Sequence, residues 1–456
     1  MTNNIVFLGS SCYYIPRKEK NDSRRNLEIF TVVTRENALE RYYKKMIVQR
    51  VEKHIIKYNS PYYQMLCDFT HKSKNLYNHA NYIVRNEFIN NGKWIRYNDL
   101  DKILKADLEF DDYRQMPTAQ CAQQTLRLLE KNWKSFFEAM KEWNKNKDKF
   151  LGRPKLPNYK PKDGKIILIL TNQNVKLKDN VLFFPKVFNG FTMAPVFTKL
   201  DNFVSFQQVR FLPQHNSFVI ELVYNVEISD SKLPDNGKYL SIDIGLDNLA
   251  TVVNNFGEKP FIINGKGLKS INTYFNKKIS HYREIANRMN KRYYTNRMFR
   301  LTQKRNNKID DYIHKASSYL VKYALSVGAN TIVIGNNKEW KQKSNMSRKI
   351  NQSFVGIPHK KFIQMVQYKA CNVGINVILT EESYTSGTSF VDREIPNKDN
   401  YNKSRRVCRG LFVSNEGIKV NADANGAYQI LKKVFPDAYT EGIEGVVLHP
   451  FRVNVA

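Results

Sequence analysis

Apolar residues in the second half of the chain alternate between short β-type runs and longer helical stretches. Three β-type runs within residues 239–263 are separated by turn residues, which predicts an antiparallel meander. Two further runs, at 331–334 and 377–380, each follow a helical stretch, as a parallel crossover requires. A last helix is expected to contain residues 422–434. The order β-β-β-α-β-α-β-…-α therefore predicts an α/β domain.

The first half of the chain has a different pattern. Residues 1–45 are polar, charged and irregular, and we interpret them as an N-terminal extension. Alternation at 46–56 predicts a strand, and apolar residues at helical spacing over 61–146 predict a helical module. A Pro- and Lys-rich connector at 152–162 leads into short alternating runs over 164–228, which predict a small β-barrel. The strand at 46–56 is expected to join this barrel, so the helical module would be an insertion.

Composition narrows the classes of function. The chain has 73 Lys and Arg against 42 Asp and Glu, a net charge of +31, which favours a polyanionic partner such as nucleic acid. The five cysteines form no C-x-x-C pair, so neither a zinc ribbon nor a disulfide framework is indicated, and a reducing cytosol is expected. No apolar run approaches the ~18 residues of a membrane span. A cytoplasmic location is therefore expected.

Two aspartates are candidates for chemistry. Asp243 ends an apolar β-type run, where a carboxylate is costly unless it binds a cation or is fully hydrogen-bonded. Asp423 lies at the expected entry of the last helix, where an acid is also common for reasons of the helix dipole alone. The predicted strand order is that of an RNase H-like domain. Such domains hydrolyse phosphodiesters with two cations about 4 Å apart, which requires carboxylates from different elements at one sheet end.

Three motifs carry a resemblance to a known family: Asp243-Ile244-Gly245, Tyr384-Thr385-Ser386 and Asn421-Ala422-Asp423-Ala424-Asn425. Together with residues 73–78, the Pro-Lys-Leu-Pro connector and Ile357-Pro358-His359, they resemble the TnpB (OrfB) family. These transposon-encoded, RNA-guided DNA nucleases are related to the compact type V CRISPR effectors. The resemblance covers most of residues 46–434.

The resemblance implies an α/β multidomain fold. It would contain an RNase H-like (RuvC) nuclease domain and a small β-barrel (wedge) domain with an inserted helical recognition domain. The expected parts are an N-terminal extension (1–45), the first wedge strand (46–58), the recognition domain (59–150), the wedge barrel (151–229), the nuclease domain (230–382), a target-nucleic-acid-binding loop insert (383–418) and the C-terminal part of the nuclease domain (419–456).

The sequence departs from the family pattern at the middle catalytic glutamate. Thr-Ile-Val-Ile is followed by Gly335, where the family has an acid, and Glu339 lies too far along. The next strand ends in Glu381-Glu382, and consecutive strand residues point to opposite faces, so one of them would face the metal site. We take Glu382 as the relocated acid and Glu381 as the alternative. Glu394, in the loop insert, is a weaker third candidate.

A second departure concerns zinc. The usual zinc-binding cysteines after the Thr-Ser motif are absent from residues 386–394, so no zinc site is expected. The implied metal is Mg²⁺ in a two-metal site of Asp243, Glu382 and Asp423. The implied partners are a transposon-derived guide RNA and double-stranded target DNA, with no membrane and a monomeric state.

Basic residues that could contact nucleic acid occur in three groups. A guide–target duplex is held through its backbone, so clustered Lys and Arg are the residues to expect there. The candidates are Lys74, Arg85, Arg153, Lys155, Lys160, Arg288, Lys291, Arg292, Arg297, Arg300, Lys304, Arg305, Arg405, Arg406 and Arg409. They come from the helical module and connector, from the basic helical stretch of about 270–326, and from the loop before the last helix. We expect the basic stretch to break near residues 305–308.

Three functions are compatible with these observations. The first is an RNA-guided, divalent-metal-dependent DNA endonuclease of a mobile element that cuts beside a short motif read by the protein. The alternative is a nuclease-inactive, RNA-guided DNA-binding repressor, which Gly335 at the acid position would explain. A basic DNA-binding accessory without RNA is a third possibility.

Overall fold

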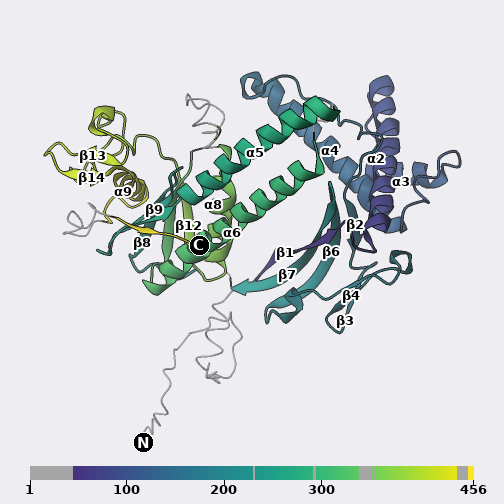
Figure 1. Ribbon diagram of the computed structural model, residues 1–456, viewed down its shortest axis with the longest axis horizontal. Coiled ribbons are helices and arrows are strands. Elements are labelled where there is room, and N and C mark those ends of the chain that lie inside the picture. The colour runs from purple at the N-terminus through teal and green to yellow at the C-terminus, as the bar shows by residue number, and fades with distance from the viewer. Residues whose placement is uncertain are drawn as a thin grey trace, which may run out of the picture. The chain divides into compact units, whose positions relative to one another are not determined.

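The computed structural model describes residues 45–229, 232–290, 294–337, 352, 355–438 and 450–455. These residues form two compact units, Met46–Ile228 and the part of the chain from Ser229 onward. The prediction of an α/β protein is confirmed, since both units combine helices with sheets (Figure 1). Among the helices of the described part of the chain, none has the length and apolar character needed to cross a membrane.

The unit of Met46–Ile228 contains a helical module. Its helices are α2 (Tyr63–Asn91), α3 (Tyr97–Ala106) and α4 (Ala119–Lys145). α4 begins at a local cap, because the Thr118 side chain accepts a hydrogen bond from the backbone N–H of Cys121. Apolar faces of α2 and α4 pack together around Leu76 and Trp133, both essentially inaccessible to solvent. The predicted helical character of this region is therefore confirmed.

The strands of the same unit form two sheets. The first has the order β1-β7-β6-β2 and the second the order β3-β4-β5. Their bounds are β1 Lys45–Lys57, β2 Leu168–Thr171, β3 Lys176–Lys178, β4 Val181–Phe183, β5 Thr192–Met193, β6 Phe203–Gln214 and β7 Ser217–Ser229. The strand predicted at 46–56 thus joins the sheet made by later residues. No ladder links the two sheets among the described residues, so closure into a barrel stays a prediction.

The second unit is built on a six-stranded sheet of order β12-β11-β8-β9-β10-β15. Its strands are β8 Tyr239–Asp243, β9 Asn248–Asn254, β10 Phe261–Asn264, β11 Thr331–Gly335, β12 Asn376–Thr380 and β15 Phe451–Val453. The first three form the predicted antiparallel meander. β11 pairs in parallel with β8 and with β12, as the helix-length spacing of these runs predicts.

Helices cover both faces of this sheet (Figure 1). Leu240, Ile242, Ile332 and Ile334 pack against the helices that precede β11 and β12. These helices are α5 (Lys266–Asn290), α6 (Asn296–Ser326) and α8 (His359–Cys371). Alternate residues turn to the other face, where Val333 packs against α9 (Ala422–Val434). Polar residues of the same parity on these strands are therefore presented to α9.

The predicted break in the basic helical stretch is misplaced. Residues 305–308 lie inside α6, and the interruption falls between Asn290, where α5 ends, and Asn296. The reason is a local cap: the Thr295 side chain accepts a hydrogen bond from the backbone N–H of Met298 and starts a new helix. Beyond this unit's sheet, β13 (Leu411–Val413) and β14 (Lys419–Asn421) form a small hairpin that leads directly into α9.

Candidate functional site

Asp243 is the last residue of β8 and lies on the face of the sheet that α9 covers. It has the same parity as Tyr239, which packs against α9 residues, whereas Leu240 and Ile242 turn to the opposite face. The turn that follows is tight, since a Cβ on Gly245 would lie 2.7 Å from the carbonyl oxygen of Asn248. The buried run thus delivers one carboxylate to the end of a central strand.

Gly335 lies next to this position on the neighbouring strand. Ile334 pairs with Ile242, so one further step in the same parallel register brings Gly335 level with Asp243. A Cβ on Gly335 would collide with the Glu382 carboxyl group, with 2.6 Å to Cγ, and would also lie 2.6 Å from Cδ1 of Ile430. The space that a side chain at 335 would need is therefore filled by Glu382. This placement agrees with the sequence-based choice of Glu382.

The Glu382 carboxylate is only partly satisfied. The Asn337 side chain donates to Glu382 Oε2 over 3.1 Å and accepts from the Glu382 backbone N–H over 3.0 Å. Oε1 is buried without a hydrogen-bond partner among the described residues. Burial raises the pKa of Glu382 to about 7, although the nearby Lys433 ammonium acts in the opposite direction. Glu381, by contrast, is exposed.

Asp423 lies in the first turn of α9. The Asn421 side chain caps this helix by accepting from the backbone N–H groups of Asp423 and Ala424, both over 3.1 Å. One stripe of the helix, at positions 423, 426, 430 and 433, then follows the strand ends. A Cβ on Gly426 would lie 3.0 Å from Oδ2 of Asp243, so glycine allows the helix to approach that carboxylate closely.

Both carboxylate oxygens of Asp423 have partners. Oδ1 accepts from Arg406 Nη2 over 3.1 Å, and Oδ2 accepts from Asn248 Nδ2 over 2.6 Å. The ion pair is partly exposed, with 39% of the Arg406 side chain and 24% of the Asp423 side chain accessible. Asn248 begins β9 in the sheet, whereas Arg406 comes from the loop before β13.

The three acids share one electrostatic environment. The pKa of Asp243 is raised well above its usual range, first by burial and then by the negative charges of Glu382 and Asp423, with Arg406 acting in the opposite direction. Mutual destabilisation of ionised carboxylates is typical of functional sites. The structure thus places near one another the three residues selected from the sequence, from β8, from the end of β12 and from α9.

A divalent cation suits this donor set. Carboxylate oxygens are the ligands that Mg²⁺ prefers, like charges gather there, and Glu382 Oε1 is a buried oxygen without a partner. Within the described ranges, however, no group of three or more His, Cys, Asp or Glu side chains is arranged to hold one ion. Asp423 contacts Arg406 and Glu382 contacts Asn337, so each of these carboxylates has a protein partner.

Three residues around the acids were missed by sequence reasoning. Asn248 and Asn337 hold two of the carboxylates, and the Lys433 ammonium donates to the carbonyls of two residues in the turn before Thr385. Gly426, one of the small residues at the start of the last helix, makes room for the third carboxylate. The sequence contains one usable signal. Asn337 stands in the segment where the family acid is absent, but its pairing with a residue 45 positions away cannot be read from spacing.

Glu394 is a structural acid. Its Oε2 accepts from the Ser389 backbone N–H over 2.8 Å and from Arg405 Nη1 over 2.6 Å, and Oε1 accepts from Asn415 over 3.1 Å. Burial raises the pKa of Glu394, but these bonds outweigh it and hold the pKa below its usual value. The Glu394–Arg405 pair joins the two sides of the loop insert. The structure therefore gives Glu394 a role in holding the loop rather than in the acid cluster.

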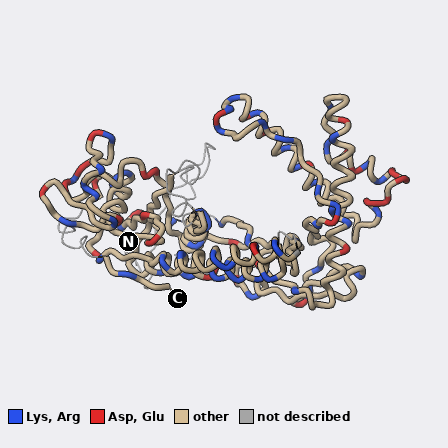
Figure 2. Tube along the Cα trace, turned by 45° about the horizontal axis from the view of Figure 1, so that its top comes forward, with Lys and Arg blue, Asp and Glu red and all other residues tan. Residues whose placement is uncertain are grey.

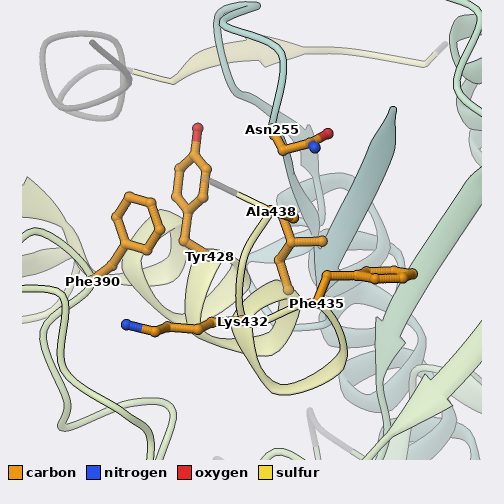
Figure 3. Close-up of a pocket in the computed structure, with 7 residues that line it drawn as sticks. Asn255, Phe390, Tyr428, Lys432, Phe435 and Ala438 are labelled. Carbon is orange, nitrogen blue, oxygen red and sulfur yellow. The ribbon is translucent and has the colours of Figure 1, made fainter. Parts of the chain in front are cut away.

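A shallow pocket lies along a different stripe of α9 (Figure 3). It is lined by Asn255, Phe390, Tyr428, Leu431, Lys432, Phe435 and Ala438. Phe390 stacks on Tyr428 with ring centroids 4.2 Å apart, and Phe435 stacks on Tyr239 at 3.8 Å. No carboxylate lines it, so this pocket is part of the packing that fixes α9 and is separate from the acid cluster.

The candidate nucleic-acid contacts of the helical module are divided between inward and outward positions. Lys74 is buried and donates to the Lys162 carbonyl over 2.7 Å, and Arg85 donates to the Pro157 carbonyl over 2.9 Å. Both hold the connector against α2, which argues against phosphate contact for Lys74. Lys160 lies over the Tyr77 ring. Two candidates on or before the connector are exposed: Arg153 and Lys155.

In the basic helices, Lys and Arg recur along both α5 and α6 (blue in Figure 2). Arg297, Arg300 and Lys304 are exposed, and Arg288 is exposed with an ion pair to Glu284. Arg305 is an exception, since its guanidinium donates to Asn272 Oδ1 and to the Gly356 carbonyl, and so ties α6 to neighbouring segments. The candidates Lys291 and Arg292 lie outside the described residues, as does Glu339.

The three candidate arginines of the loop insert each meet an acid. Arg405 pairs with Glu394, Arg406 with Asp423, and Arg409 with Asp247. Arg405 is largely covered, at 15% side-chain exposure, whereas Arg409 is 70% exposed. The loop thus delivers Arg406 to the acid cluster while its neighbours anchor the chain on either side.

Comparisons with known proteins bear on this arrangement. Residues 222–341 match the family model OrfB_IS605, described as a probable transposase, and residues 359–430 match the model of a Cas12f1-like TNB domain. The TnpB-like protein ORF457 of Acidianus two-tailed virus is 23% identical over 398 residues, which span 79% of this chain and 81% of that protein. The chain is thus similar to TnpB-like proteins. The resemblance predicted from the sequence motifs is confirmed.

Solved structures similar to this TnpB-related chain include two effector complexes. A Cas12f1–sgRNA–target DNA complex matches with 14% identity and a TM-score of 0.34, over 84% of this chain and 98% of that one. A complex of AacC2c1 with sgRNA and extended non-target DNA matches with 9% identity and a TM-score of 0.38, over 77% of this chain and 63% of that one.

Proposed function

We propose that this TnpB-related protein is an RNA-guided, divalent-metal-dependent DNA endonuclease of a mobile element. Its second unit would be the RNase H-like (RuvC) nuclease domain, with Asp243, Glu382 and Asp423 as the catalytic acids. The observation that carries the proposal is the position of Glu382, whose carboxyl group fills the space beside Gly335 and adds to the charge around Asp243. A missing acid on β11 is thereby compensated from the end of β12.

The roles of the residues follow from their environments. Asp243, Glu382 and Asp423 would hold Mg²⁺, which when bound supplies an activated water and stabilises charge on the phosphodiester oxygens. Asn248 and Asn337 orient two of the carboxylates through hydrogen bonds of 2.6 and 3.1 Å. Burial of Asp243 and of Glu382 Oε1 limits their contact with bulk water, so the charges there act strongly on a cation or phosphate beside them.

Further parts of the proposal rest on the family relation and on charge. The unit of Met46–Ile228 would contain the wedge barrel and the recognition domain, and the segment 383–418 the target-binding insert. A transposon-derived guide RNA and double-stranded target DNA would bind through exposed Lys and Arg, including those on α5 and α6, with the protein acting as a monomer. A net charge of +31 supports a nucleic-acid partner.

A cleavage assay tests the proposal. The protein is purified with its co-expressed guide RNA and incubated with matched double-stranded DNA and Mg²⁺. Asp243→Asn and Asp423→Asn are expected to lower the cleavage rate at least ~100-fold, because each removes a charge that positions the reacting groups. The exposed Glu258, outside the target-binding insert, provides a matched control, and Glu258→Gln should cut normally. Each variant is also checked for bound guide RNA and for target binding.

The alternative function remains an outcome of the same assay. Guide-dependent binding of the target without any cleavage by the unmodified protein, in Mg²⁺ or Mn²⁺, would favour the nuclease-inactive repressor. The argument for a repressor was the glycine at position 335, and this argument is weaker because Glu382 occupies the space beside that glycine. Absence of a discrete bound RNA would remove both functions in favour of a DNA-binding accessory.

A further inference from the structure

Asp423 is the one proposed metal ligand whose two carboxylate oxygens are both occupied by side chains. Asn248 Nδ2 donates to Oδ2 over 2.6 Å, and Arg406 Nη2 donates to Oδ1 over 3.1 Å. Each oxygen can accept a second contact, but the positive guanidinium at Oδ1 repels a cation at the same carboxylate, so Arg406 and a cation compete for Asp423. Asn248 is the first residue of β9 and pairs with Asn264 of β10, so its backbone is held by that ladder. The Arg406 side chain is 39% exposed and projects from a loop, so it is the partner able to leave.

Arg406 also acts on the other acids. It is the positive group that lowers the pKa of Asp243, against burial and against the negative charges of Glu382 and Asp423. Among the described residues, Lys433 has the corresponding effect on Glu382. Arg406 thus offsets part of the repulsion among three neighbouring carboxylates.

The loop around Arg406 is anchored on both sides. Arg405 is held by the largely covered Glu394, and Arg409 by Asp247, which also accepts from Lys269 over 2.9 Å. These contacts fix the backbone on either side of Arg406. The Arg406 side chain itself makes one ion pair among the described residues, with Asp423, and this pair is partly exposed to solvent. The arrangement allows the guanidinium to swing away while the loop stays in place.

We propose that Arg406 is a built-in counter-ion of the acid cluster, which a divalent cation must displace from Asp423 in order to bind. This inference rests on the proposed function, because it takes Asp423 as a metal ligand. A guanidinium and a divalent cation at the same carboxylate repel each other, so Arg406 lowers the affinity of the site for metal. Before metal binds, Arg406 stabilises the folded cluster. Once metal has displaced it, the positive guanidinium of Arg406 lies free beside the site.

Two effects of removing Arg406 separate this role from a purely structural one. Loss of an ordinary ion pair would lower stability and leave metal affinity unchanged or weaker. Loss of a counter-ion raises the affinity for the cation and lowers stability only while the cation is absent. The two measurements move in opposite directions, which a structural role does not produce.

Mn²⁺ binding tests the inference. The full chain with its guide RNA is treated with EDTA, desalted and titrated with Mn²⁺, and free Mn²⁺ is measured by electron paramagnetic resonance. Binding that is lost in Asp243→Asn is counted as binding at the acid cluster, which removes the contribution of the RNA. Arg406→Gln is expected to bind about tenfold more tightly than the unmodified protein. Arg406→Lys keeps the charge and should stay near the unmodified value.

Arg409→Gln is the matched control, because it removes the same charge from the same loop but from Asp247. It should change the cluster's affinity less than about twofold. Arg406→Met is a second neutral variant in case the Gln variant does not fold, and it must also bind more tightly. Equal or weaker Mn²⁺ binding in the neutral variants, or no binding at the cluster in any variant, overturns the inference.

The outcomes also distinguish this inference from the proposed function. If Asp243→Asn abolishes cleavage while Arg406→Gln leaves Mn²⁺ affinity unchanged, only the counter-ion role fails. If Arg406→Gln tightens Mn²⁺ binding but no variant cuts a matched target, the nuclease proposal fails and the counter-ion role stands.

Discussion

Glu382 and Glu394 lie twelve residues apart in sequence and differ in nearly every physical respect. Glu394 has partners on both oxygens, and its pKa is held below the usual value by Arg405 and its other partners despite burial. Glu382 leaves Oε1 without a partner among the described residues, and burial raises its pKa to about 7. A satisfied acid stabilises the fold, whereas an unsatisfied one beside other acids costs stability that a bound cation can recover.

The Glu394 side of this comparison predicts the largest change in stability. Glu394→Gln leaves the Arg405 guanidinium, at 15% side-chain exposure, without its charge partner. We expect a loss of about 2–3 kcal/mol in the free energy of unfolding, measured by urea denaturation. Arg405→Gln should cost a similar amount, and the double variant should be no less stable than either single one. Additive losses would show that the two side chains do not act as a pair.

Crowding at Gly335 predicts the second-largest loss of stability. Gly335→Ala places a Cβ against Glu382 and 2.6 Å from Cδ1 of Ile430, so we expect a loss of about 1–3 kcal/mol in the same denaturation experiment. The loss should be smaller when the substitution is made in a Glu382→Ala background, because half of the crowding is then removed. An identical loss in both backgrounds would mean that Glu382 does not occupy this space.

The opposite pKa shifts predict a smaller effect, on the pH dependence of stability. A native pKa of about 7 against the ordinary value of 4.5 means that folded Glu382 binds more protons than the unfolded chain between these values. Its contribution therefore lowers stability as the pH rises from about 4.5 to 7. For Glu394 the native pKa is lowered, so its stabilisation is present above its ordinary pKa and is lost as the pH falls below it.

Comparing pH profiles of unfolding in EDTA checks these signs. Glu382→Gln should flatten the profile between about pH 4.5 and 7. Glu394→Gln should leave that window unchanged and reduce the loss of stability at lower pH. A profile for Glu382→Gln that matches the unmodified protein throughout the upper window would contradict the environment assigned to Glu382.

Much of the fold could be predicted from sequence because its elements have strong local patterns. The bounds expected for the last helix match α9, since Asn421 supplies a cap just before its apolar spacing begins. The helix break was misplaced because the cap at Thr295 is a local polar contact that outweighs the polar run at 305–308. Periodicity alone does not report such a contact.

The candidate site was predictable only in part. Asp243 and Asp423 stand in recognisable motifs. For the third acid, the end of β12 offered two adjacent candidates, Glu381 and Glu382, which point to opposite faces of the sheet. The final choice depends on the register of β11 and β12, which pairs Gly335 with Thr380 and brings Glu382 back over the glycine. Buried Lys74 shows the same limit, since its hydrogen bond to Lys162 joins residues 88 positions apart. Long-range pairings of this kind are set by the fold and not by local spacing.

The central claim is that Glu382 completes the acid cluster in place of a residue on β11. The most direct measurement compares guide-dependent cleavage of a matched DNA target in Mg²⁺ by Glu382→Gln and by its neighbour Glu381→Gln. The account predicts at least a ~100-fold loss of rate for Glu382→Gln and near-normal cutting by Glu381→Gln, with guide and target binding retained by both. Near-normal cutting by Glu382→Gln, or loss of cutting only in Glu381→Gln, would contradict it.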